Sequence, residues 1–157
     1  MRNIKVNYDE KSWEGFQTDI QCYKEVLSMT LNTMNNSVDS VLKKENLSKQ
    51  EINEWINALQ SWMNRAKLWV ELPNRIKNNV DIELTDIEYF EFIRMLVHQI
   101  ESSKARLEDF KSGKFSWGEQ MIPHETEGLN RKIALYEQLE GKKYKYSDEM
   151  FKSYSVI

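Results

Sequence analysis

Apolar residues in the first third of the chain recur at the spacing of an α-helix. Five of them lie seven residues apart, namely Trp13, Ile20, Leu27, Met34 and Val41. Residues at this spacing share one side of a helix, and further apolar residues fill the adjacent positions. The pattern predicts a long helix over residues 13–44, which ends at a polar Asn-Leu-Ser segment.

The segment 49–72 has the most regular pattern in the chain. Ser48 and Glu51 precede it at the spacing of a capping box, which is typical of a helix start. Pro73 ends the predicted helix, because proline disfavours helical geometry in the residue before it. Two rows in the segment repeat every seven residues, one made of Ile52, Leu59 and Ala66 and the other of Trp55, Trp62 and Trp69. The short link to the preceding helix predicts an antiparallel hairpin.

Two more helices are predicted in the second half of the chain. Thr85 and Glu88 have the spacing of a second capping box, which opens a helix over residues 86–112. Pro123 suits the first turn of a shorter helix over residues 123–140.

The segments outside these helices predict little regular structure. Residues 3–8 and 80–84 alternate apolar and polar side chains, which is the period of a half-buried strand. A two-stranded ribbon between them is marginal unless it packs on the helices. The tail, residues 141–157, is expected to contain at most a short helix over residues 147–154.

These elements predict an all-α fold in one domain, residues 1–157. The three long helices are expected to bury their apolar stripes by packing as an antiparallel bundle. The fourth helix and the ribbon would then cover an open face or one end. A chain of 157 residues suits a single domain, and five glycines and two prolines are too few for a β-sandwich or barrel.

The composition indicates a soluble, cytoplasmic protein. The formal net charge of −3 gives no electrostatic reason to expect nucleic acid or a membrane surface as a partner. No apolar run approaches the roughly 18 residues that a membrane-spanning helix needs. The N-terminus shows no signal-peptide pattern. Cys22 is the only cysteine, which excludes an internal disulfide and suggests a reducing compartment.

The sequence lacks the motifs of common enzyme chemistry. His98 and His124 are the only histidines, and neither belongs to a zinc-protease or di-iron pattern. Glycine-rich phosphate loops and the Gly-x-Ser-x-Gly nucleophile motif are absent as well. We therefore expect no catalytic residues, no metal and no cofactor.

Two features are candidate surfaces for a partner protein. The first is an acidic run made of Asp81, Glu83, Asp86, Glu88 and Glu91. This run either forms a negative patch for a basic partner or offsets the dipole at the start of a helix. The second is a loop that carries Phe115 and Trp117 between glycines. These aromatic residues either contact a partner or fold back to cap the end of the bundle.

The tryptophan row admits two interpretations. Large apolar residues at helical spacing are usually part of the core. Tryptophan is also enriched at interface hot spots, so Trp55, Trp62 and Trp69 are a candidate oligomer interface. Three indoles are bulky for a tight helical seam, and each buried N–H needs an acceptor. Both interpretations therefore stay open.

The missing chemical motifs and the abundant aromatic residues favour a small non-enzymatic protein-interaction module. An inhibitor, immunity or adaptor protein that blocks another protein fits this description. The asparagine and lysine usage is typical of an AT-rich bacterial or phage genome. One alternative is a self-associating structural protein that forms a homodimer through the helix over residues 49–72. Another is an enzyme with paired carboxylates in a helical cleft.

Overall fold

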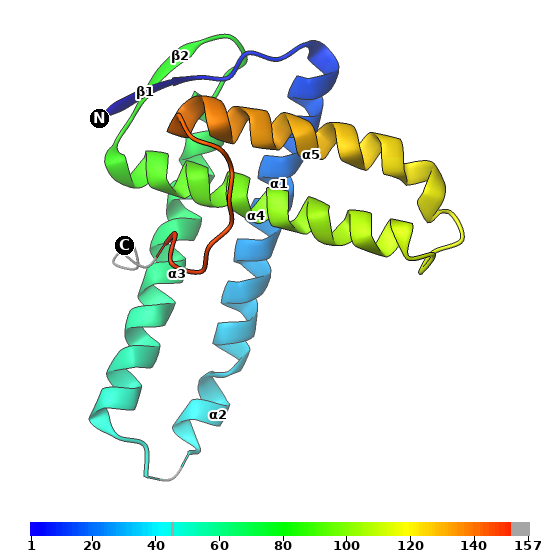
Figure 1. Cartoon of the computed structure of the whole chain (residues 1–157). Coiled ribbons are helices and arrows are strands. Elements are labelled where there is room, and N and C mark those ends of the chain that lie inside the picture. The colour runs from blue at the N-terminus through cyan, green and yellow to red at the C-terminus, as the bar shows by residue number, and fades with distance from the viewer. Residues whose placement is uncertain (45, 152–157) are drawn as a thin grey trace.

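Two helical hairpins cross in this protein (Figure 1). The computed structural model describes residues 1–44 and 46–151. Its elements in chain order are β1 (Arg2–Lys5), α1 (Glu10–Asn36), α2 (Val38–Leu42), α3 (Lys49–Arg75), β2 (Asp81–Leu84), α4 (Asp86–Lys111) and α5 (Gly118–Glu140). The hairpin of α4 and α5 lies across the upper part of the hairpin of α1 and α3 (Figure 1). The expected all-α fold with a small β-ribbon is confirmed.

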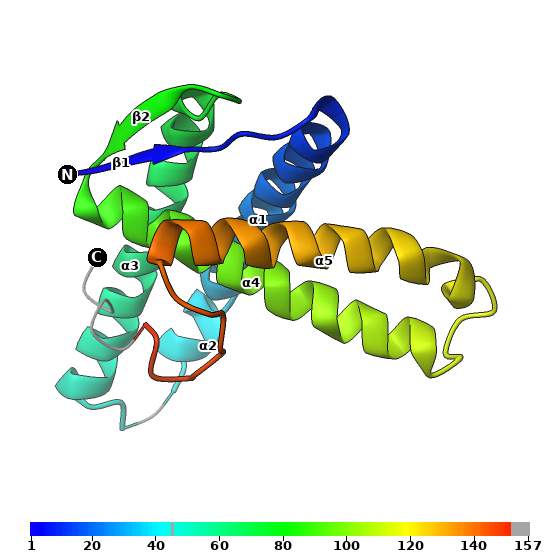
Figure 2. The same ribbon diagram turned by 45° about the horizontal axis from the view of Figure 1, so that its top comes forward.

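Helix α4 forms the centre of the core. Thirteen of its residues are buried, among them the five consecutive residues from Tyr89 to Ile93. A helix buried on every side must be covered from several directions. Helix α5 runs beside α4, α1 and α3 cross it, and the chain after α5 passes over it (Figures 1 and 2). In that tail, Tyr144 and Phe151 pack against the core.

The predicted ribbon forms between the two expected segments, although its first strand ends at Lys5 and not at residue 8. Strands β1 and β2 are antiparallel, with Arg2 opposite Leu84 and Lys5 opposite Asp81. Ile4 and Leu84 are 3% and 0% exposed. Their burial against the helices stabilises a two-stranded ribbon that would be marginal on its own.

The first predicted helix, over residues 13–44, is divided in two. Asp9 accepts a hydrogen bond from the Ser12 amide and caps α1, which therefore begins earlier than predicted. The helix ends one residue before Ser37, and the short α2 follows. The Ser37 hydroxyl donates a hydrogen bond to the Thr33 carbonyl at 2.8 Å. Bonds of this kind compete with the helical hydrogen bonds and often bend a helix.

Both prolines lie inside helices, which corrects two predicted boundaries. Helix α3 continues past Pro73 because the buried side chains of Leu72 and Ile76 hold its last turn against the core. Helix α5 begins at Gly118, so Pro123 lies beyond the first turn. Its missing N–H removes one helical hydrogen bond, to the carbonyl four residues earlier, and α5 continues through this proline.

The other predicted boundaries are close to those observed. Helix α4 ends at residue 111, one residue before the predicted end, and its predicted capping box is present. Gly141 ends α5 in a left-handed conformation with φ of 68°. The short tail helix predicted over residues 147–154 does not form in the described part of the tail, where residues 148–151 make a turn. Residues 152–154 lie outside the described residues.

The hairpin of α1 and α3 continues beyond the core as a two-helix arm. We define the arm as residues 28–64, which lie between the buried residues Leu27 and Arg65. No described residue of the arm is itself buried. Figure 1 shows the arm reaching away from α4 and α5. Its helices therefore share one seam and leave their outer faces to solvent.

Candidate functional site

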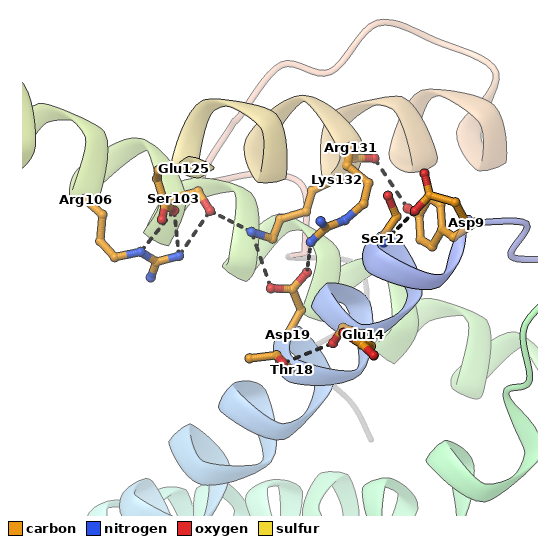
Figure 3. Close-up of polar contacts among 11 residues, drawn as sticks. Asp9, Ser12, Glu14, Thr18, Asp19, Ser103, Arg106, Glu125, Arg131 and Lys132 are labelled. Carbon is orange, nitrogen blue, oxygen red and sulfur yellow. Dashed lines mark hydrogen bonds and ion pairs between the residues drawn. The ribbon is translucent and has the colours of Figure 1, made fainter. Parts of the chain in front are cut away.

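A polar cleft of about 410 Å³ lies where α5 crosses the first half of α1. Its walls come from α1, α4 and α5, as Figure 3 shows for part of the cleft. The described residues include six buried polar or charged side chains. Four of these lie in the cleft or beside it, namely Asp19, Gln99, Ser103 and Lys132. Helices usually cross through apolar contacts, so this concentration of polar groups marks the cleft as a candidate site.

Asp19 holds two cations of α5 together. Arg131 donates a hydrogen bond from Nη2 to Oδ2 of Asp19 at 3.2 Å, and Nζ of Lys132 lies 3.4 Å from Oδ1. Both basic side chains point from α5 toward α1 (Figure 3). Burial raises the pKa of Asp19 above its usual value, although both cations act to lower it. Burial likewise lowers the pKa of Lys132.

Ser103 links this group to a second ion pair. Lys132 donates to the Ser103 hydroxyl at 2.8 Å, and Arg106 donates to it at 3.2 Å. Arg106 also lies 2.9 Å from the Glu125 carboxylate. Burial acts to raise the pKa of Glu125, but hydrogen bonds from Arg106 and Ser103 outweigh it and the pKa lies below its usual value. Ser103 is 0% exposed, so the geometry does not present its hydroxyl to a substrate.

A second polar cluster is enclosed where the two hairpins cross. Its centre is Glu91, which is 0% exposed. Arg65 Nε lies 3.0 Å and Arg94 Nε 3.5 Å from one carboxylate oxygen. The indole of Trp69 and the hydroxyl of Tyr23 donate to the other oxygen at 3.3 and 3.4 Å. This cluster connects α1, α3 and α4 inside the core.

The acidic run is divided between the surface and this interior cluster. Glu91 points into the core and cannot contact a partner. The prediction that Glu91 is part of a partner-binding surface is therefore wrong. Glu88 closes the α4 capping box and forms an ion pair with Arg75. Asp81, Glu83 and Asp86 are exposed, so only these three present an acidic surface to solvent.

The aromatic loop closes the end of the α4–α5 hairpin. The rings of Phe115 and Trp117 stack with centroids 4.8 Å apart. Both also meet the buried Phe110 edge-on, at 6.4 and 5.6 Å. Trp117 stays 51% exposed. The loop therefore folds back to cap the end of the hairpin, which is one of its two interpretations. The Trp117 indole still lies half exposed at the surface.

The tryptophan row runs from the core into the arm. Trp69 is 1% exposed and its indole N–H has an acceptor in Glu91. Trp62 and Trp55 lie closer to the N-terminal end of α3, in the arm, and are partly exposed. The guanidinium of Arg65 lies 4.2 Å from the centre of the Trp62 ring. Core packing is thus shown for Trp69, while the two arm tryptophans border solvent.

The outer face of α3 carries an apolar row that we call the α3 stripe. It consists of Ile52, Ile56, Met63 and Val70, whose side chains are 38%, 49%, 50% and 65% exposed. The surrounding surface is unusual in charge. Residues 26–38 and 55–64 contain no charged side chain, although 30% of the whole chain is charged. The first segment lies mostly in α1 and the second in α3, so each helix of the hairpin contains a stretch without charge.

Sequence reasoning alone did not find the cleft. Its residues come from three helices, and no short motif joins them. One signal was present. Asp19, Ser103 and Lys132 occupy inward positions of their helices, where the periodicity calls for apolar side chains. A charged or polar residue at such a position indicates an interior partner.

Comparisons with known proteins give no relative. No protein-family model, curated protein or solved structure matches the chain. None of the described helices combines the length and apolar character needed to span a bilayer. The described residues also contain no group of three side chains suited to hold a metal ion. Function must therefore be inferred from the chain's own surfaces and clefts.

Proposed function

We propose that this protein is a non-enzymatic, cytoplasmic protein-interaction module of the inhibitor, immunity or adaptor kind. We infer that it contacts its partner through the arm. The observation that carries this proposal is the α3 stripe, a row of apolar side chains that runs from the arm to Val70 and that no element of the described residues covers. Contiguous exposed apolar surface on a small protein is typical of a protein-binding site.

The α3 stripe also indicates the chemistry of the partner. It extends over 19 residues of α3, from Ile52 to Val70, which is roughly 27 Å of helix. Apolar residues three, four and seven apart are the pattern that packs against another helix. Around Ile56 and Met63 the neighbouring polar residues are amides, namely Asn57, Gln60 and Asn64, whereas the exposed Lys67 lies beside Val70. The proposed occupant is therefore a helix with an apolar, uncharged face, since charges are depleted at the centre of protein interfaces.

The two surfaces predicted from the sequence, the acidic run and the aromatic loop, contribute less to this proposal than the α3 stripe. Asp81, Glu83 and Asp86 are open to a basic partner, and Trp117 offers half of its indole. Neither surface has the length or continuity of the α3 stripe. The asparagine and lysine usage supports an accessory protein of a bacterial or phage genome.

Site-specific photo-crosslinking tests the proposal. A photo-crosslinking amino acid replaces Met63, and the protein is irradiated in cells of its source or host. We expect one dominant adduct with a different protein, and we expect Ile56→Glu to abolish it because a charge would enter an apolar contact. Ile87→Glu is the matched control, since Ile87 is an equally exposed apolar residue at the start of α4.

The outcomes separate the alternatives. Circular dichroism of both variants establishes that they remain helical. The absence of any adduct at Met63, or its persistence in Ile56→Glu, would contradict an interaction through the arm. An adduct with the same protein in the Ile87→Glu variant would support it.

Self-association is the second candidate function. A two-fold interface places a surface against itself, so like charges on that surface would repel each other. The charge-free segment 55–64 in the middle of the α3 stripe avoids this repulsion, which favours a homodimer formed through the α3 stripe. In that case the adduct at Met63 would have twice the mass of the chain. The molar mass measured by light scattering would also rise with protein concentration and fall in Ile56→Glu.

A further inference from the structure

We propose that the partner helix continues from the α3 stripe into a groove between α1 and α3, where it places two apolar anchor residues with one carboxylate between them. This inference rests on the proposed function, because it concerns the same partner, and it adds the side chains that the partner must present. Two apolar hollows in the groove carry it, together with a lysine between them that has no partner in the described part of the chain.

The groove contains two hollows along the α1–α3 hairpin, whose helices run side by side (Figure 1). The first hollow, of about 230 Å³, is lined by Leu27 and Trp69, and the second, of about 240 Å³, by Ile20 and Ile76. Lys24 lines both hollows, so they adjoin each other. No residue of α4 or α5 lines either one, so the crossing hairpin leaves this side open. Each is smaller than a small-molecule site, roughly 300–1,000 Å³, and suits one large apolar side chain of a partner.

The apolar floors of the hollows repeat at heptad spacing. Ile20 and Leu27 are seven residues apart on α1, and Trp69 and Ile76 are seven residues apart at the end of α3. All four side chains are buried. Seven residues of helix span roughly 10 Å. A partner helix that lies along the groove therefore reaches both hollows with apolar residues one heptad apart.

The groove is continuous with the α3 stripe. Val70 is the last residue of the stripe and also lines the first hollow. Met63 and Ile56 precede Val70 by one and two heptads, so these three residues lie on the same side of α3. A helix bound along the stripe is therefore led to the groove.

Lys24 specifies the charge of the partner. Among the described residues it is the only charged one that lines either hollow. Its side chain is partly buried and forms no hydrogen bond or ion pair with another described residue. The next residue, Glu25, is exposed and accepts a hydrogen bond from Gln21 instead. Covering this ammonium with an apolar helix is costly unless that helix supplies a counter-charge. The partner therefore carries a carboxylate between its two anchor residues.

The acidic position belongs to one end of the partner helix. Residues 55–64 are free of charge, so the partner face over the middle of the α3 stripe is uncharged. Beyond that segment Lys24 is followed by Glu25 on α1, and Lys67 and Glu71 are one turn apart on α3. These four charges cancel at a distance, so the proposed ion pair forms on contact and adds no long-range attraction.

Carbodiimide crosslinking tests the ion pair. A water-soluble carbodiimide joins a lysine amine to a carboxylate that contacts it, with loss of water. The full chain is mixed with an extract of its source or host cells, crosslinked and digested, and the joined peptides are sequenced by mass spectrometry. We expect Lys24 to be joined to an aspartate or glutamate of a different protein. Large apolar residues should lie three or four positions to either side of that acid, seven residues apart from each other.

Three outcomes of the crosslinking would overturn the proposal. They are no adduct at Lys24, an adduct that joins two copies of this chain, and a partner carboxylate without the two flanking apolar residues.

Charge variants connect the groove with the α3 stripe. In the chain that carries the photo-crosslinker at position 63, Lys24→Glu should lower the yield of the adduct at least about fivefold, because two carboxylates would then repel each other. Lys24→Met keeps an apolar side chain of similar length and should also lower the yield, whereas Lys24→Arg should retain it. Lys111→Glu, at an exposed position at the end of α4, is the control and should leave the yield unchanged. Circular dichroism establishes that each variant is helical.

The two proposals fail in different ways. No adduct at position 63 while Lys24 is intact would contradict an interaction through the arm. An adduct at position 63 whose yield is the same in Lys24→Glu and Lys24→Met would overturn only the proposal for the groove.

Discussion

Glu91 and Asp19 show how much a single buried charge depends on its partners. Removing an ion from water is costly, and only close opposite charges and hydrogen bonds compensate for it. Glu91 has two guanidinium groups, an indole N–H and a phenol O–H around its carboxylate. Asp19 has two cations from one helix. The two acids thus fix how α1 meets α4 and α5.

We predict that Glu91→Gln lowers the free energy of unfolding by about 3–5 kcal/mol, because Arg65 and Arg94 would lose their shared counter-charge inside the core. Urea denaturation followed by circular dichroism measures the change. Glu83→Gln is the control, since this exposed member of the same acidic run should change stability by less than about 0.5 kcal/mol. Similar losses in the two variants would show that burial does not distinguish these carboxylates.

At the scale of helices and turns, the α4–α5 hairpin depends on the close approach of its ends. Gly118 begins α5, and a Cβ atom placed on it would lie 3.1 Å from the Cα atom of Phe110 and 3.2 Å from its carbonyl oxygen. Backbone atoms of this kind cannot rotate away as a side chain can. The stacked rings of Phe115 and Trp117 then cover the junction.

A matched pair of glycine variants tests this packing. Gly118→Ala should destabilise the protein by about 1–3 kcal/mol, because the added methyl group forces the two helix ends apart. Gly128→Ala lies in the same helix, where the nearest atom to the new Cβ is 3.8 Å away. It should be neutral or stabilising by up to about 1 kcal/mol through helix propensity. Thermal melting of both variants measures the difference, and a loss of stability in Gly128→Ala alone would contradict the account.

Sequence patterns predicted where the helices lie along the chain better than how these helices pack against one another. The capping boxes at Ser48 and Thr85 gave two helix starts correctly, because the signal is local. The heptad stripes identified buried faces but not which helix covers each face. Helix α4 illustrates the limit. It was expected to pack alongside the first two long helices, whereas α5 runs beside it and the first hairpin crosses it.

The candidate site lay beyond the reach of motif reasoning for a related reason. Asp19, Gln99 and Lys132 come together only because the hairpins cross, and no spacing along the chain records that crossing. The surface at the α3 stripe was partly visible in the sequence. Ile56, Met63 and Val70 flank the tryptophan row at helical spacing, but periodicity cannot tell a covered face from an open one.

At the scale of the whole molecule, stability is expected to be unevenly distributed. The core surrounds α4, whereas the arm has a single helical seam and no buried residue among those described. Local opening is easiest where few buried apolar contacts must break. The arm should therefore open while the helical segments packed around α4 remain folded.

Hydrogen exchange of the backbone amides measures this difference. We predict that the amides of residues 49–64 exchange at least about tenfold faster than those of residues 92–107 in α4. Dilute protein is used, because a partner or a second copy bound to the α3 stripe would slow exchange in the arm. Equal protection in both segments would show that the arm is as firmly held as the core.

The lack of charge around the middle of the α3 stripe also determines how quickly a partner can find it. Charged interfaces draw their partners together over long distances, and added salt slows that encounter. The uncharged segments 26–38 and 55–64 offer no such attraction, so encounter at this surface would proceed by unaided diffusion, at about 10⁵–10⁶ M⁻¹s⁻¹. This rate would be nearly independent of ionic strength. Discrimination between partners would then reside in the lifetime of the complex.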